Sequence, residues 1–273
     1  MKYKLVFLFI CAKFILCTST SAQTVLDSVI WRVYYDSEYR DTEEDGQRKA
    51  RHHLDIGNDV TCFYDWKQER KQSLSDSLSA HGGNPSEIID VYKQNGVSGS
   101  CTSYIVYKEK KRKSLKYIEK ILNPYEYEES LPDFSWELVE GDTIIAGFHC
   151  QHARTEFRGR VWDCWYTLEI PINDGPWKLC GLPGLILAAY DAKGDFTFSC
   201  AGIEHIVGEC ITSRYSGKTE KCTPQRLNEI KIIEARSFTE SIFLAFGSRA
   251  RRYDANGKLM GDENKTAVLM EMY

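Results

Sequence analysis

The chain has 273 residues, of which 42% are hydrophobic and 27% are charged, and its formal net charge is −4. This slightly acidic balance argues against nucleic acid as a partner, because a polyphosphate backbone is bound by clustered Lys and Arg. After residue 22, no stretch is long and apolar enough to span a bilayer, so we do not expect an integral membrane protein.

Residues 1–22 are typical of a secretory signal peptide, since Lys2 and Lys4 precede an apolar stretch that ends in small residues. The alternative, an uncleaved membrane anchor, needs about 18 apolar residues, and Lys13 interrupts this stretch. Cys17 is not preceded by the small residues that accompany lipidation. We therefore expect a cleaved signal and a periplasmic or secreted protein that is not a lipoprotein.

Eight cysteines follow this segment, and an even number in an exported chain predicts up to four disulfides. The most local candidate pair is Cys210 with Cys222, which would close a polar loop. Free buried thiols are the alternative, because a chain of this length folds without covalent staples. The disulfide candidates are Cys62, Cys101, Cys150, Cys164, Cys180, Cys200, Cys210 and Cys222.

Alternating apolar residues predict strands in the first half of the mature chain. The ranges that show this alternation are 29–35, 60–64, 104–107 and 115–121. A charge run at 108–113 separates the last two. We expect this run to be the solvated end of a hairpin, with a binding patch as the alternative.

A helical insert is predicted at 67–100, between two of these strands. Asn84-Pro85 supplies a helix start and Asn95-Gly96 supplies a stop, which predicts a short helix over 85–94. Residues 67–80 form the other predicted helix of the insert.

The centre of the chain predicts a hairpin. Its strands cover 144–150 and 162–170, and its turn lies at Arg158-Gly159. A three-residue loop would put both apolar sets on one face, which sets Cys164 opposite Arg154. Cys150 and Cys164 should therefore not bond each other.

A further hairpin is predicted from 184–190 and 196–201, and Thr223-Pro224 starts a helix that should continue to about residue 246. The predicted strands come first, are connected as hairpins and are followed by one long helix. This order predicts an α+β fold. We expect a single domain over 23–273. Its curved antiparallel sheet would be a half-barrel, like that of lipoprotein carriers, with the long C-terminal helix packed on it.

A signature run, Cys-Gly-Leu-Pro-Gly-Leu-Ile-Leu, occupies 180–187. Pro183 between two glycines fixes a turn, and the run contains no nucleophile, acid or base. We therefore favour an architectural role for it. In the alternative, the exposed turn with Trp177 would contact a partner.

Together with Trp177-Lys178 and the hairpin block 146–167, the signature run resembles the GLPGLI family of Bacteroidota. The resemblance implies an exported protein, and such relatives are often encoded beside outer-membrane receptors of the TonB-dependent type. Because that family has no established activity, the resemblance implies an envelope partner and no particular reaction.

Few patterns in the chain carry chemistry. Cys150 and His152 share one side of a strand and are weak candidate metal ligands, but two further ligands would have to come from elsewhere. His81-Gly82-Gly83 resembles an oxyanion loop, yet no Gly-x-Ser-x-Gly elbow accompanies it. The nucleotide, dinucleotide, zinc-protease and Cys-x-x-Cys motifs do not occur in the sequence, so we predict no catalytic residue and no cofactor.

We predict a non-catalytic periplasmic binding or accessory protein that serves an outer-membrane receptor or carries a lipid or peptide ligand. Trp177, Pro183, Trp165 and Tyr166 are the candidate contact residues, since aromatic side chains combine apolar area with a polar handle. The alternatives are an envelope hydrolase and a metal-handling protein. A hydrolase predicts a cleft with polar groups of shifted pKa, a carrier predicts a continuous apolar cavity, and a receptor accessory predicts an exposed aromatic patch around Trp177.

Overall fold

The computed structural model describes residues 24–215, 217–247, 252–253 and 258–273. The predicted signal peptide, residues 1–22, lies outside the described residues. Within the described part of the chain, no helix is long and apolar enough to cross a membrane.

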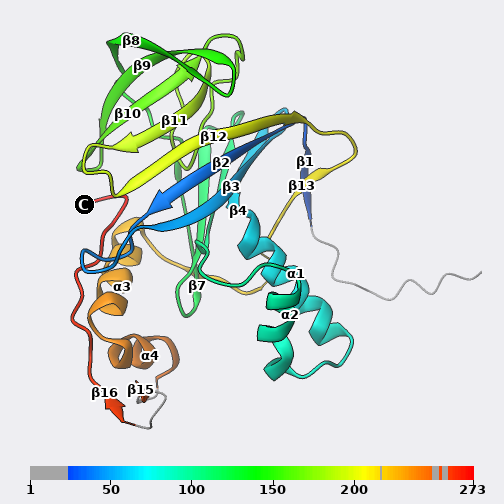
Figure 1. Cartoon of the computed structure of the whole chain (residues 1–273), viewed down its shortest axis with the longest axis vertical. Helices are drawn as coiled ribbons and strands as arrows, with labels where there is room; N and C mark the ends of the chain where they lie inside the picture. Colours follow the sequence, from blue (N-terminus) through cyan, green and yellow to red (C-terminus); the bar gives the residue numbers. More distant parts are fainter. Residues whose placement is uncertain (1–23, 216, 248–251, 254–257) are drawn as a thin grey trace, which may run out of the picture.

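In the described residues, one twelve-stranded sheet forms the body of the protein (Figure 1). In sheet order its strands are β14 (Glu220–Lys221), β7 (Pro124–Ser130), β6 (Ser114–Lys120), β5 (Tyr104–Glu109), β4 (Val60–Asp65), β3 (Arg48–Ile56), β2 (Trp31–Tyr39), β12 (Phe196–His205), β11 (Leu185–Asp191), β10 (Arg160–Thr167), β9 (Phe148–Phe157) and β8 (Glu137–Ile145). Neighbouring strands are antiparallel except for the parallel pair β14–β7. This confirms the predicted class, a large and mostly antiparallel open sheet with few helices.

Two small two-stranded sheets lie outside this body. One joins β1 (Val25–Ser28) to β13 (Cys210–Thr212), and the other joins β15 (Arg252–Tyr253) to β16 (Leu259–Met260).

Helices occur in two places in the described chain. The insert contains α1 (Trp66–Ala80), a 3-10 turn η1 (Pro85–Glu87) and α2 (Ile88–Gln94), which confirms both helices predicted there. Asp65 starts α1, since its side chain accepts a hydrogen bond from the backbone N of Lys67 at 2.8 Å.

Our prediction of a single long C-terminal helix is wrong. The structure has α3 (Pro224–Arg236) and α4 (Phe238–Phe246), separated at Ser237. Ser237 is extended, with φ −147°, and its hydroxyl accepts a hydrogen bond from the backbone N of Glu240 at 3.1 Å. A serine that caps the next helix in this way ends the preceding one.

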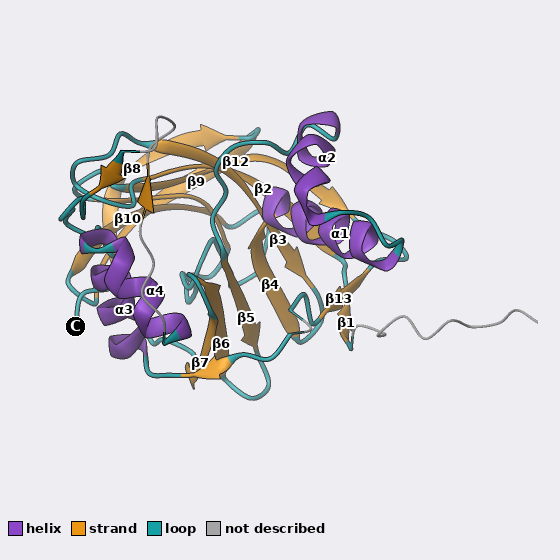
Figure 2. Cartoon of the chain, turned by 90° about the horizontal axis from the view of Figure 1, so that it is seen from below, coloured by secondary structure: helices purple, strands orange, loops and turns teal. Residues whose placement is uncertain are grey.

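The sheet curls, because a short link joins its two ends. β7 and β8 lie ten strand steps apart in the sheet order, which is about 48 Å in a flat sheet. Only residues 131–136 connect them, and a link of that length spans at most about 24 Å. Figure 2 shows the result, a sheet wrapped around an interior with α3 and α4 on the side where β7 and β8 face each other.

The central hairpin differs from our prediction in register. Its turn does lie at Arg158-Gly159, but both residues have positive φ (48° and 77°), as in a two-residue loop. Cys164 therefore pairs with Ala153 and not with Arg154. The buried side chains of β9 next to the turn are Ala153 and Thr155, so the inward-facing set already matches the two-residue loop.

The strand predicted over 144–150 is also interrupted. β8 ends at Ile145 and β9 begins at Phe148, and between them Ala146 and Gly147 have φ values of 50° and 88°. These two residues form a second tight turn. The sequence alternation continued across it because both strands present apolar residues.

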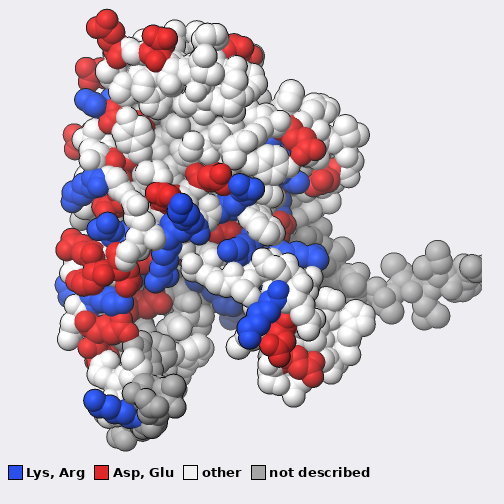
Figure 3. Space-filling model, in the orientation of Figure 1, with Lys and Arg blue, Asp and Glu red and all other residues white. Residues whose placement is uncertain are grey.

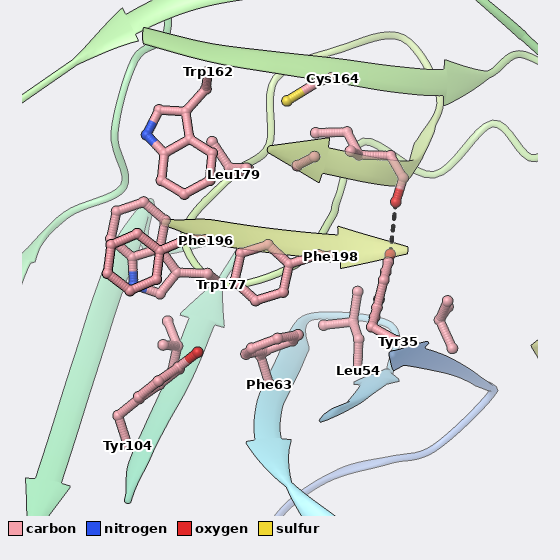
Figure 4. Packing of buried hydrophobic residues seen from close by; sticks show 14 of the residues in the cluster. Tyr35, Leu54, Phe63, Tyr104, Trp162, Cys164, Trp177, Leu179, Phe196 and Phe198 are labelled. Carbon is pink, nitrogen blue, oxygen red and sulfur yellow. Dashed lines mark hydrogen bonds between the residues drawn. The ribbon is translucent and has the colours of Figure 1, made fainter. Parts of the chain in front are cut away.

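The concave face of the sheet encloses the main core (Figure 4). Trp162, Trp177 and Phe198 pack there together. Tyr35 is fully buried beside them and donates its hydroxyl hydrogen to the carbonyl oxygen of Ile186 at 2.6 Å. A smaller apolar cluster lies on the opposite face of the sheet.

A loop between β10 and β11 fills the interior of the sheet, and we call residues 173–183 the inner loop. Its residues Trp177, Lys178 and Leu179 are each at most 1% exposed. Trp177 packs on Trp162, with 5.5 Å between the ring centroids. Within the described structure, the concave face is therefore occupied by the protein's own chain and not by a continuous apolar cavity.

Two buried lysines hold the inner loop in place. Lys108 of β5 donates to the carbonyl oxygens of Gly175 (2.9 Å) and Leu179 (3.3 Å), and it pairs with Asp174. Our prediction that Lys108 lies at a solvated hairpin end is wrong, because the inner loop covers this lysine. Lys178 makes the second set of contacts, with β7 and with the C-terminal segment.

Steric and backbone constraints explain why glycine occupies two positions of the signature run. A Cβ atom at Gly184 would lie 1.9 Å from the carbonyl oxygen of Thr167, so only glycine fits. Gly181 has φ 97°, which disfavours other residues, and it follows Cys180, whose carbonyl accepts a hydrogen bond from Trp136 at 3.0 Å. These contacts support the architectural role that we favoured.

Candidate functional site

An open pocket of about 400 Å³ lies where the β2–β3 loop, β5, β6, α3 and the C-terminal segment meet. Backbone hydrogen bonds join these parts: Val268 donates to Asp41 at 2.8 Å, and Lys265 donates to Ala235 at 3.1 Å. Figure 1 shows α3 and the C-terminal segment side by side next to the β2–β3 loop. In Figure 3, acidic and basic side chains alternate over the same side of the molecule, whereas the region of β8–β10 is mostly uncharged.

A second cavity of about 300 Å³ lies against α1 and includes Arg214. Arg214 is already paired there with Asp55 at 2.6 Å, and its guanidinium lies over the ring of Tyr64. The Nε of Arg214 has no hydrogen-bond partner among the described residues, but Asp55 balances the charge of its guanidinium, so we regard the first pocket as the better candidate.

Five carboxylates line the first pocket, and two of them, Asp45 and Glu263, are paired with Lys265. The other three come from different elements: Asp41 from the β2–β3 loop, Glu119 from β6 and Glu234 from α3. Glu119 forms an ion pair with Lys231 at 2.7 Å. Asp41 forms one with Arg48 at 2.8 Å. Glu234 makes no ion pair or hydrogen bond with any residue that the structure describes.

The surroundings disfavour negative charge at two of these groups. Burial raises the pKa of Glu234 above its ordinary value, and the charges of Glu119 and Asp41 add to this effect. Burial also raises the pKa of Asp41, against the opposing charges of Arg48 and Lys231. Water reaches both groups, since Glu234 is an exposed residue and the Asp41 side chain is 49% exposed, so solvent moderates both shifts. A positively charged ligand group would reverse both shifts.

Tyr104 lines the pocket with an unsatisfied hydroxyl. The residue is 5% exposed, and its hydroxyl oxygen bonds to no described residue. Its ring stacks against His52 (5.5 Å) and Tyr117 (5.8 Å), which fixes its orientation. Burial and then the charges of Glu119 and Asp65 raise the pKa of this hydroxyl. A buried polar group without a partner costs about 1–3 kcal/mol.

Arg40 is the other unsatisfied polar side chain that we single out at this pocket. Its Nε is shielded from solvent and has no hydrogen-bond partner among the described residues. Its guanidinium forms no ion pair with them either. A cation (Arg40), an anion (Glu234) and a neutral hydroxyl (Tyr104), none with a partner among the described residues, thus line the same pocket. Such an arrangement can bind a small polar ligand by charge and by hydrogen bonds.

The contact residues that we predicted from sequence lie elsewhere. Trp177 and Tyr166 are buried, Trp165 is half-buried and Pro183 is exposed. The expectation of an exposed aromatic patch around Trp177 is wrong, because the Trp177 indole packs on Trp162 in the core. None of the four candidates is among the residues that line the pocket.

Cys150 and His152, the weak metal candidates, have separate surroundings. Cys150 packs in the main core. His152 stacks on Trp165 at 4.5 Å and hydrogen-bonds to Asp163 at 2.7 Å. Among the described residues, no group of three or more His, Cys, Asp or Glu side chains could hold a metal ion.

All eight cysteines of the described chain are free thiols, so the structure does not show the predicted disulfides. Cys210 is exposed on β13 and Cys222 is half-buried next to α3. Burial raises the pKa of Cys62 and of Cys180 to about 11, which keeps these thiols protonated at neutral pH.

A serine and a histidine do hydrogen-bond to each other in the core. Ser37 Oγ lies 2.8 Å from His52 Nδ1, and His52 Nε2 lies 2.7 Å from Thr102 Oγ1. Burial lowers the pKa of His52 to about 3, so the imidazole is neutral. Because Ser37 is only 2% exposed, this chain of hydrogen bonds supports the packing of β2, β3 and the segment before β5 and presents no accessible nucleophile.

Sequence reasoning missed the residues of this pocket. One signal was present: Glu119 alternates with Tyr117 on a predicted strand and so points inward, where an unpaired carboxylate is rare. Asp41 lies in a loop and Glu234 lies on a helix more than a hundred residues after Glu119. Only the tertiary fold brings these side chains together.

Comparison with protein families gives one match. The family described as a protein of unknown function (Porph_ging) matches residues 100–188. This range runs from just before β5 to β11 and includes the inner loop and the signature run. A comparison with curated proteins found no match.

Among solved structures, the chain is similar in fold to PNGF-II in two crystal forms, with TM-scores of 0.51 and 0.50 and 12% sequence identity. The similarity covers 77% of this chain but 34% of PNGF-II, so the chain spans about a third of that protein. A LolA superfamily protein from Nitrosomonas europaea matches with a TM-score of 0.27 and 8% identity, over 67% of this chain and 89% of that one. At this identity, the similarity to PNGF-II concerns the fold alone.

Proposed function

We propose that the protein is a non-catalytic binding protein of the bacterial envelope that holds a small polar ligand in the pocket between β6 and α3. The buried, unsatisfied hydroxyl of Tyr104 carries this proposal. Buried polar groups in folded proteins are almost always hydrogen-bonded, so one that lines an open pocket is available to bond a ligand atom.

The proposal favours a polar ligand over a lipid. A carrier of acyl chains needs a continuous apolar cavity, and the inner loop fills the concave face where such a chain would lie. The remaining pocket is lined by charged and hydroxyl side chains from several elements.

The arrangement of the carboxylates in the pocket also agrees better with a binding function than with hydrolysis. General acid–base chemistry uses two groups that can each exchange a proton in the reaction. Here Glu119 is paired with Lys231 and Asp41 with Arg48, which leaves Glu234 alone without an ion pair.

The envelope setting of the proposal comes from the sequence. The signal-like segment 1–22 and the resemblance to the GLPGLI family support export, and the family match at 100–188 covers the signature run. We further propose that the mature chain, residues 23–273, is one domain with a helical insert at 67–100. Its partner in this proposal is an outer-membrane receptor of the TonB-dependent type, which the resemblance to the GLPGLI family supports and the buried Trp177 does not.

Native mass spectrometry of the protein purified from the envelope of cells that export it tests the binding function. We expect the wild type to retain a small molecule and Tyr104→Phe to lose it. A wild-type protein that is ligand-free, and that no amino acid, peptide, sugar or fatty acid stabilises against heat, would contradict the proposal. Cross-linking in the same cells would test the receptor as partner.

An envelope hydrolase is the second candidate, favoured by the raised pKa of Glu234. It predicts that the wild type converts the retained molecule to products on incubation and that Glu234→Gln does not. Recovery of the unchanged molecule from the wild type would support binding and exclude this alternative.

A further inference from the structure

The unpaired charges of the pocket have opposite signs. Glu234 offers a carboxylate without an ion pair, and Arg40 offers a guanidinium without one, in the part of the chain that the structure describes. Most of the other charged groups at the pocket are already paired with each other. The remaining charged side chains that line it are Asp41, Asp45, Arg48, Glu119, Lys120, Lys231, Glu263 and Lys265.

These pairs explain why Glu234 and Arg40 differ from their neighbours. Lys231 neutralises Glu119 at 2.7 Å, and Lys265 lies 2.8 Å from Asp45. Lys120 also lines the pocket without an ion pair to a described residue, so the pocket offers two cations, of which Arg40 has a polar atom shielded from solvent. A ligand that brought a single charge would leave either Glu234 or these cations without a counter-charge. A ligand with both an anionic and a cationic group satisfies both.

The neutral hydroxyl adds a third requirement. Tyr104 can donate one hydrogen bond and accept others, and it lines the same pocket as Glu119 and Asp41. An ammonium group near these carboxylates would have acceptors in Glu234 and in the tyrosine oxygen. A sugar would satisfy the hydroxyl but would leave both free charges without a counter-ion.

We propose that the ligand is a small zwitterion, a free amino acid or short peptide, whose ammonium group is bound by Glu234 and whose carboxylate is bound by Arg40. Tyr104 accepts from the ammonium group or donates to the backbone carbonyl next to it. The inference rests on the proposed binding function and names the class of ligand. A pocket of about 400 Å³ has room for such a molecule.

Calorimetric titration of the full mature chain with L-alanyl-L-alanine tests the two charges separately. The matched probes are the same dipeptide with an acetylated amino terminus and with an amidated carboxyl terminus. We expect each cap to weaken binding about tenfold or more, because each removes a charge-assisted hydrogen bond. Equal binding of the capped and free dipeptides would overturn the inference.

Two substitutions assign the ends of the ligand. In Glu234→Gln, the acetyl cap should no longer matter while the amide cap still does, and in Arg40→Gln the reverse should hold. Glu229→Gln is the control, since Glu229 is an exposed residue of α3 outside the pocket lining. It should leave all three affinities unchanged. Thermal unfolding of each variant shows that it is folded. If both caps matter equally in every variant, the assignment is wrong.

The outcomes separate this inference from the proposed function. A neutral sugar that binds the wild type and loses affinity in Tyr104→Phe would keep the binding function and overturn the zwitterion. Failure of every probe to bind, together with a ligand-free protein from the envelope, would overturn both.

Discussion

Lys178 Nζ lies 2.6 Å from Glu271 Oε1, although the two residues are 93 positions apart. The same ammonium group lies 2.6 Å from Glu129 Oε1 and donates to the hydroxyl of Tyr127 at 2.8 Å. One buried cation thus joins the inner loop to β7 and to the C-terminal segment. Because that segment also forms one wall of the pocket, the position of the inner loop and the shape of the pocket are linked.

Replacement of Lys178 should therefore be costly. Lys178→Met leaves Glu129 and Glu271 partly buried with fewer counter-charges, and we expect the free energy of unfolding to fall by about 3–5 kcal/mol. Urea denaturation measures this change. Lys49→Met is the control, since Lys49 is 85% exposed and pairs with Glu38 at the surface, so a change below about 1 kcal/mol is expected. Similar small changes in both variants would contradict the role of Lys178.

The ion-pair cluster around Lys178 also makes the free energy of unfolding depend on pH. Burial alone would raise the pKa of Glu129, but the hydrogen bond from Arg158 and the charge of Lys178 outweigh it and hold the pKa below the ordinary 4.5. The stabilisation is fully present above pH 4.5 and is lost as the pH falls through the lowered pKa.

We expect Glu129→Gln to remove this part of the pH dependence. Chemical denaturation between about pH 5 and pH 3 should show a smaller loss of stability in the variant than in the wild type. Glu128→Gln, an exposed neighbour on β7, should keep the wild-type slope. A slope unchanged in Glu129→Gln would show that other carboxylates govern acid unfolding.

The signature run gives a steric prediction. Gly184→Ala would place a Cβ atom 1.9 Å from the Thr167 carbonyl oxygen, and backbone on both sides must shift to relieve the overlap. We expect a loss of about 3 kcal/mol in the free energy of unfolding. Gly46→Ala, where a Cβ atom would meet nothing within 4 Å, should change it by less than about 0.5 kcal/mol. If the two variants unfold at the same temperature, the architectural account of the signature run is incorrect.

Tyr104→Phe should stabilise the ligand-free protein and weaken binding at the same time. The substitution removes a buried hydroxyl that has no partner, so the free energy of unfolding should rise by about 1–2 kcal/mol. Tyr35→Phe is the matched control. It removes a hydroxyl that bonds to the Ile186 carbonyl at 2.6 Å and should cost about 1 kcal/mol. A loss of stability in both variants would mean that Tyr104 has a partner within the protein.

Local features of the sequence predicted those parts of the fold that depend on neighbouring residues. The hairpin of β11 and β12 was predicted over 184–190 and 196–201, and Gly194 in the turn between its strands has the positive φ (70°) that a tight turn needs. The caps at Asn84 and Thr223 also act locally, through their own side chains.

Predictions failed where a distant segment decides the outcome. Lys108 looks like part of a solvated charge run, but the chain that covers it lies 67 residues later. The register of the central hairpin depended on which residues of β9 face inward, and this changes along the strand. The pocket could not be predicted for the same reason, since Asp41, Glu119 and Glu234 come from three separate elements.

Titration of the Glu234 carboxyl by carbon-detected NMR, with and without saturating L-alanyl-L-alanine, tests the central claim most directly. In the free protein the pKa of Glu234 is raised by burial and by the charges of Glu119 and Asp41. A bound ammonium group favours the ionised carboxylate, so the dipeptide should lower this pKa. A Glu234 pKa that does not change at saturating dipeptide would contradict the account.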